Sequence, residues 1–172
     1  MLTPILEYEI DRPGAKIRSL GFTVERMVAE EGLFERRTGQ QSPLKTFYDV
    51  WATTTTFEPA KHSEIWIQNI DTSSESPLGF VWHRHTGLTF GNLSGRAVGS
   101  LTNRFLREAC AIEYTAAKHI GQPIYHVIEQ TIDGMHRKYT RLIIPDSEQV
   151  LYYVYRLIDP PRPVSVAPCE SA

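Results

Sequence analysis

The sequence predicts an α+β fold in which helices cover one face of a five-stranded antiparallel sheet. Two strand-like segments joined by a polar turn come first, one long amphipathic helix follows, and three strand-like segments come last. Strands that follow one another in runs, instead of alternating with helices, are typical of α+β architectures. The predicted strands are residues 64–70, 79–85, 124–132, 137–144 and 150–158, and the predicted helix is residues 101–120.

The predicted helix has clear signals along its length and at both ends. Its apolar residues recur at steps of three and four, which gives one apolar stripe. Ser100 or Thr102 can cap its start, and Gly121 can adopt the left-handed conformation past its end. Glu113 is one of the charged residues off the stripe. The stripe consists of Leu101, Phe105, Ala109, Ile112, Ala116 and Ile120.

The last three predicted strands form a meander. Residues 124–132 alternate between two faces, and Asp133-Gly134 is a strong signal for a two-residue hairpin turn. The segment 86–100 has a glycine every four residues, which disfavours a long helix. We therefore expect this segment to be a loop with short helical turns that serves as a lid over the helix-facing side of the sheet.

The length of 172 residues fits one domain with flanking segments. Residues 1–43 are expected to be an N-terminal extension that packs loosely on the main domain, with a short helix within 24–37. Residues 44–159 form the main domain and begin with a helix at 44–52. Residues 160–172 contain three closely spaced prolines, so we expect a mobile tail that does not join a sheet.

Composition excludes several classes of protein. The chain has 18 Lys+Arg and 20 Asp+Glu, a balance that argues against a nucleic-acid-binding surface and a polybasic membrane-binding surface. No apolar run approaches the roughly 18 residues that a membrane span needs. Two cysteines and the lack of a signal-like N-terminus indicate a reducing compartment, so we expect a cytoplasmic protein with neither nucleic acid nor membrane as a partner.

Four short motifs occur in a fixed order along residues 44–158. They are Tyr48-Asp-Val-Trp51, Leu93-Ser-Gly95, Glu113-Tyr114 followed by Gly121-Gln-Pro123, and Tyr139-Thr-Arg-Leu-Ile-Ile-Pro145. With these motifs and this order of elements, the chain resembles a PAS domain, and within that class a family of small, often standalone bacterial PAS proteins. The resemblance implies a half-open cup formed by a PAS-like five-stranded sheet and its helices. It also implies a sensory or small-ligand-binding signalling module without its own output domain, acting as a homodimer or through a signalling partner protein.

In such a cup, the helix-facing side of the sheet lines the ligand pocket. Pockets of this kind are mainly apolar, with a few well-placed polar groups. The expected ligand is a small apolar or aromatic molecule whose identity stays open. The candidate pocket residues are Trp66, Trp82, Phe105, Ala109, Ile112, Tyr114, Ala116, His126, Tyr139 and Tyr153.

Cofactor signals are weak. His83 and His85 alternate on a predicted strand and could bind a metal or haem, but two ligands make an incomplete zinc site. The sequence favours a polar strand face there, with Trp82 turned toward the core. Residues 102–106 are similar to the flavin-binding motif of blue-light PAS sensors, but Asn103 stands where the reactive cysteine would be, which disfavours flavin photochemistry.

The sequence contains no nucleophile elbow, phosphate loop or dinucleotide fingerprint. We therefore expect no enzymatic activity, and two alternatives to the sensor stay open. One is a small cone-shaped α+β enzyme of the isomerase or dehydratase type, which a cavity holding a buried Asp or Glu would favour. The other is a ligand-free dimerisation scaffold, which a closed apolar core would favour.

Overall fold

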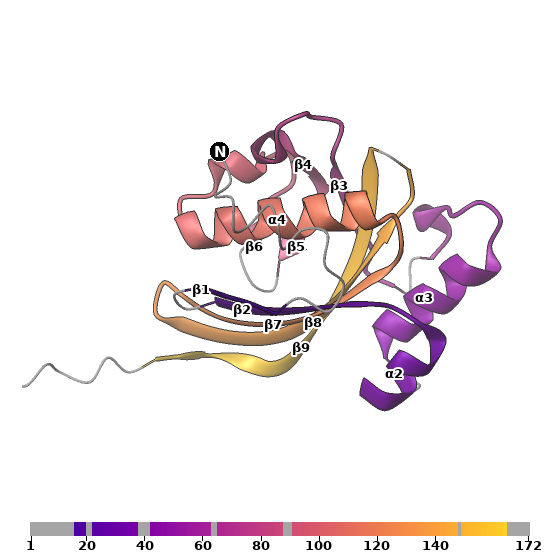
Figure 1. Cartoon of the computed structure of the whole chain (residues 1–172), viewed down its shortest axis with the longest axis horizontal. Helices are drawn as coiled ribbons and strands as arrows, with labels where there is room; N and C mark the ends of the chain where they lie inside the picture. The colour runs from indigo at the N-terminus through magenta and orange to yellow at the C-terminus, as the bar shows by residue number, and fades with distance from the viewer. Residues whose placement is uncertain are drawn as a thin grey trace, which may run out of the picture.

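Seven strands form one antiparallel sheet in the order β1-β2-β7-β8-β9-β3-β4 in the computed structural model (Figure 1). The structure describes residues 16–19, 22–37, 42–62, 65–87, 91–147 and 149–164. The predicted α+β class with an antiparallel sheet is confirmed. The strands of the sheet are β1 Lys16–Ser19, β2 Phe22–Val28, β3 Gln68–Asp71, β4 Val81–Arg84, β7 Ile124–Ile132, β8 Met135–Pro145 and β9 Val150–Pro163.

The remaining elements are short except for two of the helices. A separate two-stranded ladder joins β5 Thr86–Gly87 to β6 Gly91–Asn92. The α-helices are α2 Glu31–Arg37, α3 Pro43–Thr53 and α4 Arg104–Ile120, and the 3₁₀ turns are η1 Pro59–Lys61, η2 Pro77–Gly79 and η3 Val98–Ser100. The predicted helix at 44–52 therefore forms, with proline in its first turn, where a missing N–H is best tolerated.

The meander is the best-predicted part of the fold. Strand β7 has the predicted bounds, and β8 follows it through the two-residue turn Asp133–Gly134, where both residues have positive φ (52° and 71°). The hairpin β3–β4 then joins the meander through β3, whose Gln68 lies opposite Tyr153 of β9. The two groups of predicted strands thus close into a single sheet.

The expectation of a loosely packed N-terminal extension is wrong for residues 22–37, and its part at residues 1–15 lies outside the described residues. Residues 22–28 form β2, which pairs with β7 along its whole length, and the helix in this region begins only at Glu31. The apolar residues at 24, 27 and 28 fit the spacing of a helix as well as that of a strand. The strand forms because β7 provides hydrogen-bond partners for it. The sheet consequently has seven strands instead of five.

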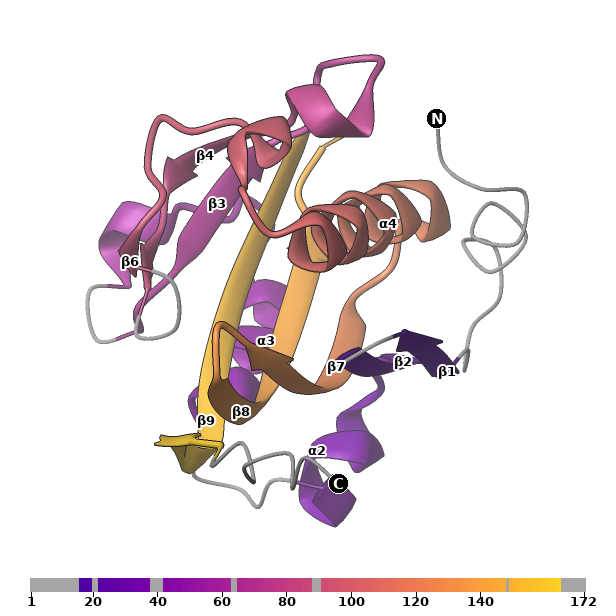
Figure 2. The same ribbon diagram turned by 90° about the vertical axis from the view of Figure 1, so that its left-hand side faces the viewer.

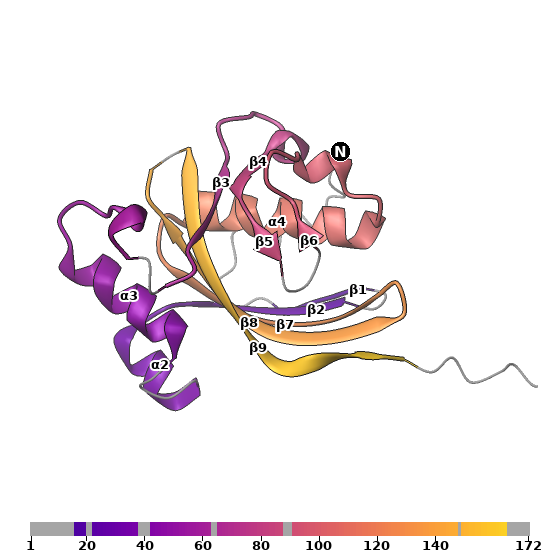
Figure 3. The same ribbon diagram turned by 180° about the vertical axis from the view of Figure 1, so that it is seen from behind.

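Helices cover both faces of the sheet, which corrects the prediction of one covered face. Helix α4 lies over one face, and α2 and α3 pack near one end of the other (Figures 1 and 3). Successive residues of one strand pack on the two faces. On β8, Ile143 packs under α4, while Leu142 and Ile144 pack on the other face. There they contact the cluster that contains Phe34 of α2 and Phe47 of α3.

The C-terminal prediction also needs correction. Strand β9 continues through the prolines to Pro163, which lies opposite Met135 of β8. Strand β3 pairs only with residues 150–153 of β9, so the rest of β9 is an edge on that side. Prolines are tolerated at sheet edges because a missing N–H disrupts no ladder there. The expected tail beyond residue 164 lies outside the described residues.

Helix α4 begins later than predicted, and its buried face matches the predicted stripe only in part: Ile112 and Ala116 are buried as expected. Its N-cap is Asn103, whose side-chain oxygen accepts a hydrogen bond from the Leu106 amide (3.0 Å), and Gly121 ends it in the left-handed conformation (φ 66°). Phe105, expected on the buried stripe, is 42% exposed, whereas Glu113, expected outside it, is only 2% exposed. The buried side of the helix therefore carries a charge, and that charge organises the site described next.

Candidate functional site

Three basic residues lie side by side across neighbouring strands, under α4. Arg26 of β2 pairs in register with His126 of β7, and His126 pairs in register with Arg141 of β8. All three side chains are buried, with exposed fractions of 1%, 0% and 6%. A row of basic groups inside a protein needs negative charge or strong acceptors nearby, because burial disfavours an unpaired charge.

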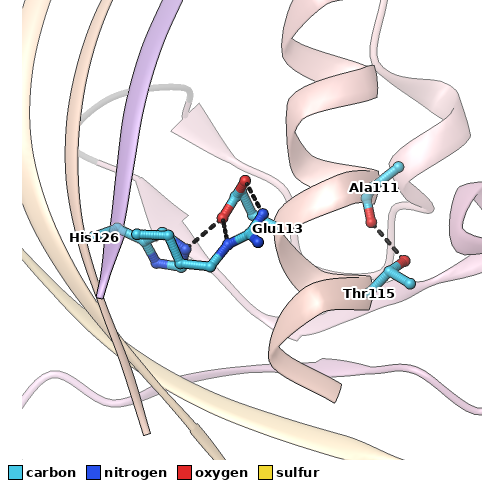
Figure 4. Close-up of polar contacts among 5 residues, drawn as sticks. Ala111, Glu113, Thr115 and His126 are labelled. Carbon is cyan, nitrogen blue, oxygen red and sulfur yellow. Dashed lines mark hydrogen bonds and ion pairs between the residues drawn. The ribbon is translucent and has the colours of Figure 1, made fainter. Parts of the chain in front are cut away.

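Glu113 of α4 provides that negative charge for two of the three. Its carboxylate accepts two hydrogen bonds from Arg26, from Nε (2.9 Å) and Nη2 (2.8 Å), and its Oε2 lies 2.5 Å from Nε2 of His126. Figure 4 shows Glu113 and His126 pointing toward each other from the helix and the sheet. This paired arrangement fixes the position of α4 on β2 and β7, because a two-pronged Arg–carboxylate contact is strong and directional.

The electrostatics of this cluster fix its protonation states. Burial opposes ionisation of Glu113, but His126 and Arg26 outweigh burial and lower the pKa of the carboxyl to about 2. Burial likewise dominates for His126 and lowers its pKa to about 4, although Glu113 acts in the opposite direction. At neutral pH, Glu113 is therefore ionised and His126 is neutral, so the ion pair of Arg26 and Glu113 is complete in itself.

Arg141 has no such partner. Within the described part of the chain, no carboxylate lies within ion-pair distance of it, and its Nε has no hydrogen-bond partner. Its guanidinium carbon lies 5.1 Å from the ring centre of Tyr114, and its Nη1 donates a long hydrogen bond (3.4 Å) to the Tyr114 hydroxyl. An arginine keeps its charge in any protein environment. A buried positive charge thus remains unneutralised next to Tyr114.

A cavity of about 30 Å³ lies at Arg141, between α4, the sheet and the segment that precedes α4. Figure 2 shows α4 lying alongside the long strands β8 and β9, with β3 and β4 continuing the sheet beyond β9. The volume is enough for two or so water-sized groups and too small for an aromatic ring. Its lining consists of Trp82, His85, Leu93, Leu101, Leu106, Cys110, Tyr114, Tyr139, Arg141, Tyr153 and Tyr155.

Polar groups of the lining are connected in two short chains. Trp82 Nε1 donates to the Tyr114 hydroxyl (3.2 Å), which also accepts from Arg141. His85 Nδ1 lies 2.6 Å from the Tyr153 hydroxyl, and its Nε2 is buried without a partner among the described residues. Burial, followed by the charge of Arg141, lowers the pKa of His85 to about 4. The imidazole is therefore neutral at physiological pH.

The other ionisable groups at the cavity are neutral as well. Burial raises the pKa of Cys110 to about 11 and raises the pKa of Tyr114, Tyr139 and Tyr153 above the usual tyrosine range. None of these side chains supplies a negative charge at pH 7. Among the described residues of the lining, Arg141 is consequently the single charged side chain.

Comparison of the chain with models of protein families, with curated proteins and with solved structures finds no match. No helix in the described residues is long and apolar enough to cross a membrane. The same residues contain no group of three or more His, Cys, Asp or Glu side chains that could hold a metal ion.

The ten candidate pocket residues fall into three groups. Trp82, Tyr114, Tyr139 and Tyr153 line the cavity. Ala109, Ile112, Ala116 and His126 lie in or beside the buried core and outside the cavity. Trp66 is 54% exposed, with Arg84 stacked over its ring, and Phe105 is also on the surface. The cavity is thus formed by the sheet's aromatic residues and by a helix face one step away from the predicted stripe.

The two weak metal candidates lie in different environments. His83 is exposed, and its Nε2 lies 3.5 Å from the carboxylate of Asp71. His85 follows β4, and its side chain is buried against Tyr153. The expected shared polar face of these two histidines is therefore wrong, because β4 ends at Arg84 and the regular alternation ends with it. Trp82 is turned into the core as predicted, with an exposed fraction of 1%.

Sequence reasoning missed Arg141 as a site residue. A signal was present: residues 139, 141 and 143 alternate on one face of the predicted strand, so a tyrosine, an arginine and an isoleucine share it. A charged residue between two core-facing positions indicates a buried charge with a specific role. Leu93, Leu101 and Leu106 were not identified as a group because they surround the cavity only after the segment before α4 has folded over it.

Proposed function

We propose that this chain is a PAS-like sensory module that binds a small molecule in the cavity between α4 and strands β8 and β9. The observation that carries the proposal is the convergence of Trp82, Tyr114 and Arg141 on one cavity. The order of hairpin, long helix and meander, which carries the resemblance to PAS domains, supports the same proposal. In this proposal the protein acts in the cytoplasm, as a homodimer or with a signalling partner.

The protonation states favour ligand binding over the acid–base enzyme. Among the described residues, the cavity lining contains no Asp or Glu, and the nearby Glu113 is held ionised by its two partners. A general acid or base works best with a pKa near the operating pH, whereas Glu113 and His85 titrate at about 2 and about 4. A cavity under the helix, in place of a closed apolar core, likewise favours a ligand-binding module over a ligand-free scaffold.

The contacts of α4 suggest how occupancy could be transmitted. Tyr114 lies at the cavity, and its chain neighbour Glu113 holds β2 through Arg26. A ligand that displaces Tyr114 must move α4 or strain the ion pair beside it. Occupancy would thereby favour one arrangement of α4 and β2 over another, which is the differential binding that a sensor needs.

Native mass spectrometry of the freshly purified protein tests this function by looking for a retained small molecule. Two variants make the result specific to the cavity. Cys110→Leu places additional atoms at the cavity wall, whereas Ala116→Leu enlarges a fully buried residue that does not line the cavity. We expect Cys110→Leu to lose the ligand and remain folded. Ala116→Leu should lose about 1–3 kcal/mol of stability through overpacking and keep the ligand.

A single pattern of results contradicts the proposal. If the wild-type protein retains no molecule, and no compound from a screened panel raises its melting temperature, the cavity does not bind ligands. The scaffold alternative would then stand.

A further inference from the structure

We propose that the ligand of this cavity is a small monocarboxylic acid, whose carboxylate pairs with Arg141 and whose apolar body lies between Leu93, Leu101 and Leu106. This inference rests on the proposed function and adds the chemical class of the ligand.

The charge of the site calls for one anionic group. Two arginines are buried in the row under α4, and one carboxylate, Glu113, neutralises Arg26. Arg141 is left with aromatic neighbours and one long hydrogen bond. A cation in such a place is stable only with a counter-charge, since burial of an unpaired ion is strongly unfavourable. One monoanion neutralises the charge of Arg141, whereas a dianion such as phosphate would bring a second, unneutralised negative charge into the site.

Both unpaired polar atoms of the cavity lining can act as donors. Arg141 Nε always carries a hydrogen, and neither it nor His85 Nε2 has a partner in the described residues. If the Tyr153 hydroxyl donates to Nδ1 of the neutral His85, Nε2 of that ring carries the hydrogen. A carboxylate offers two acceptor oxygens, and a planar guanidinium fork is the group that best matches it.

The size of the cavity and its surroundings divide the ligand into two parts. About 30 Å³ accommodates a carboxylate group but no larger body. On the outer side, Leu93, Leu101 and Leu106 also line a surface groove of about 330 Å³. The three leucines thus line both the cavity and the groove, and an apolar body attached to the carboxylate would lie among them.

The outer groove also favours an anion as it approaches. Among the described residues that line it, the charged ones are Arg96, Arg137 and Asp133, two positive and one negative. A concave surface with an excess of one sign raises the local concentration of ions of the opposite sign. The groove and the cavity therefore select for the same charge.

The test compares matched acids and amides on three proteins. Butyrate, hexanoate and benzoate are titrated calorimetrically at pH 7.5 beside butyramide, hexanamide and benzamide, with sodium nitrate as a simple anion. The proteins are the wild type, Arg141→Gln and Arg156→Gln. Arg156 makes a matched control because it is exposed and lines a groove on the opposite face of the sheet.

We expect the wild type and Arg156→Gln to bind at least one acid at least tenfold more tightly than its amide, and Arg141→Gln to lose that preference. Equal affinity for acids and amides in the wild type, which requires no variant to fold, would overturn the carboxylate assignment and leave the sensory function intact. Binding of nitrate as tight as that of every acid would reduce the site to a simple ion site and also overturn it. If neither acids, amides nor nitrate bind, the inference fails, and the retained-ligand experiment decides separately on the function.

Discussion

His126 and Arg141 occupy directly paired positions on β7 and β8, yet only His126 contacts the carboxylate of Glu113. The difference divides the polar interior under α4 into two parts. On the β2 side, Arg26, Glu113 and His126 form a completed structural cluster. On the β9 side, Arg141 faces an aromatic cavity with its charge unpaired. One part fixes the helix, and the other provides a place where binding can be coupled to the helix.

Glu113→Gln should strongly destabilise the protein. The variant leaves Arg26 buried without its carboxylate, and breaking a buried ion pair on one side typically costs about 3–5 kcal/mol. Urea unfolding followed by circular dichroism measures the loss. Glu108→Gln is the control, since Glu108 pairs with Arg104 on the exposed side of the same helix and should contribute about 0.5 kcal/mol or less. Equal effects of the two substitutions would show that the buried cluster does not hold α4.

Acid should destabilise the fold well before the carboxylates of the surface titrate. The pKa values of His85 and His126 are both about 4 in the folded protein, below the ordinary 6.5, so the unfolded chain binds more protons between these values. Their contribution to stability is complete above pH 6.5 and is lost as the pH falls through 4. For His85 the shift corresponds to roughly 3 kcal/mol.

Urea midpoints at pH 7.5, 6.0 and 5.0 test this pH dependence. We expect a steady fall toward pH 5.0 in the wild type and a smaller fall in His85→Gln. His83→Gln is the control, because His83 is exposed on β4. A slope that is unchanged in His85→Gln would mean that His85 does not titrate as its burial implies.

Gly121→Val should cost about 1–2 kcal/mol. Gly121 ends α4 with φ at 66°, and a branched side chain is penalised in that conformation although no atom would obstruct its Cβ. Asparagine tolerates the left-handed region better, so Gly121→Asn should lose clearly less stability. Thermal melts of the two variants check the order, and a valine variant as stable as the asparagine variant would contradict it.

The sequence pattern was sufficient to predict those elements that are determined by residues close together in the chain. Alternation and the Asp133–Gly134 turn predicted β7 and β8 because both signals act between residues close in the chain. The same kind of reasoning failed for β2, whose spacing fits a helix until β7 provides hydrogen-bond partners. It also placed helices on one face only, since the short helix expected within 24–37 was placed without the strand β2, which occupies the first part of that range.

The site was less predictable because its decisive contacts are long-range. Glu113 and Arg26 are 87 positions apart, and an acidic residue on a helix normally indicates a solvent-facing position. Three aromatic residues of the lining, Trp82, Tyr139 and Tyr153, could be predicted because half-buried strands favour aromatics and alternation gives their face. The unpaired state of Arg141 depends on which strand received Glu113, and no local pattern contains that information.

Arg141→Met should stabilise the ligand-free protein, in contrast to most substitutions of buried residues. The variant removes an uncompensated charge and keeps an apolar chain of similar length, so we expect a gain of about 1 kcal/mol or more in low-salt buffer without carboxylates. Arg26→Met is the matched control: it lies in the same row of the sheet but leaves Glu113 unpaired, so it should lose several kcal/mol. Urea unfolding of both variants distinguishes an arginine that stabilises the fold, as expected for Arg26, from one that binds a ligand, as expected for Arg141. A loss in Arg141→Met as large as that in Arg26→Met would show that Arg141 already has its partner within the fold.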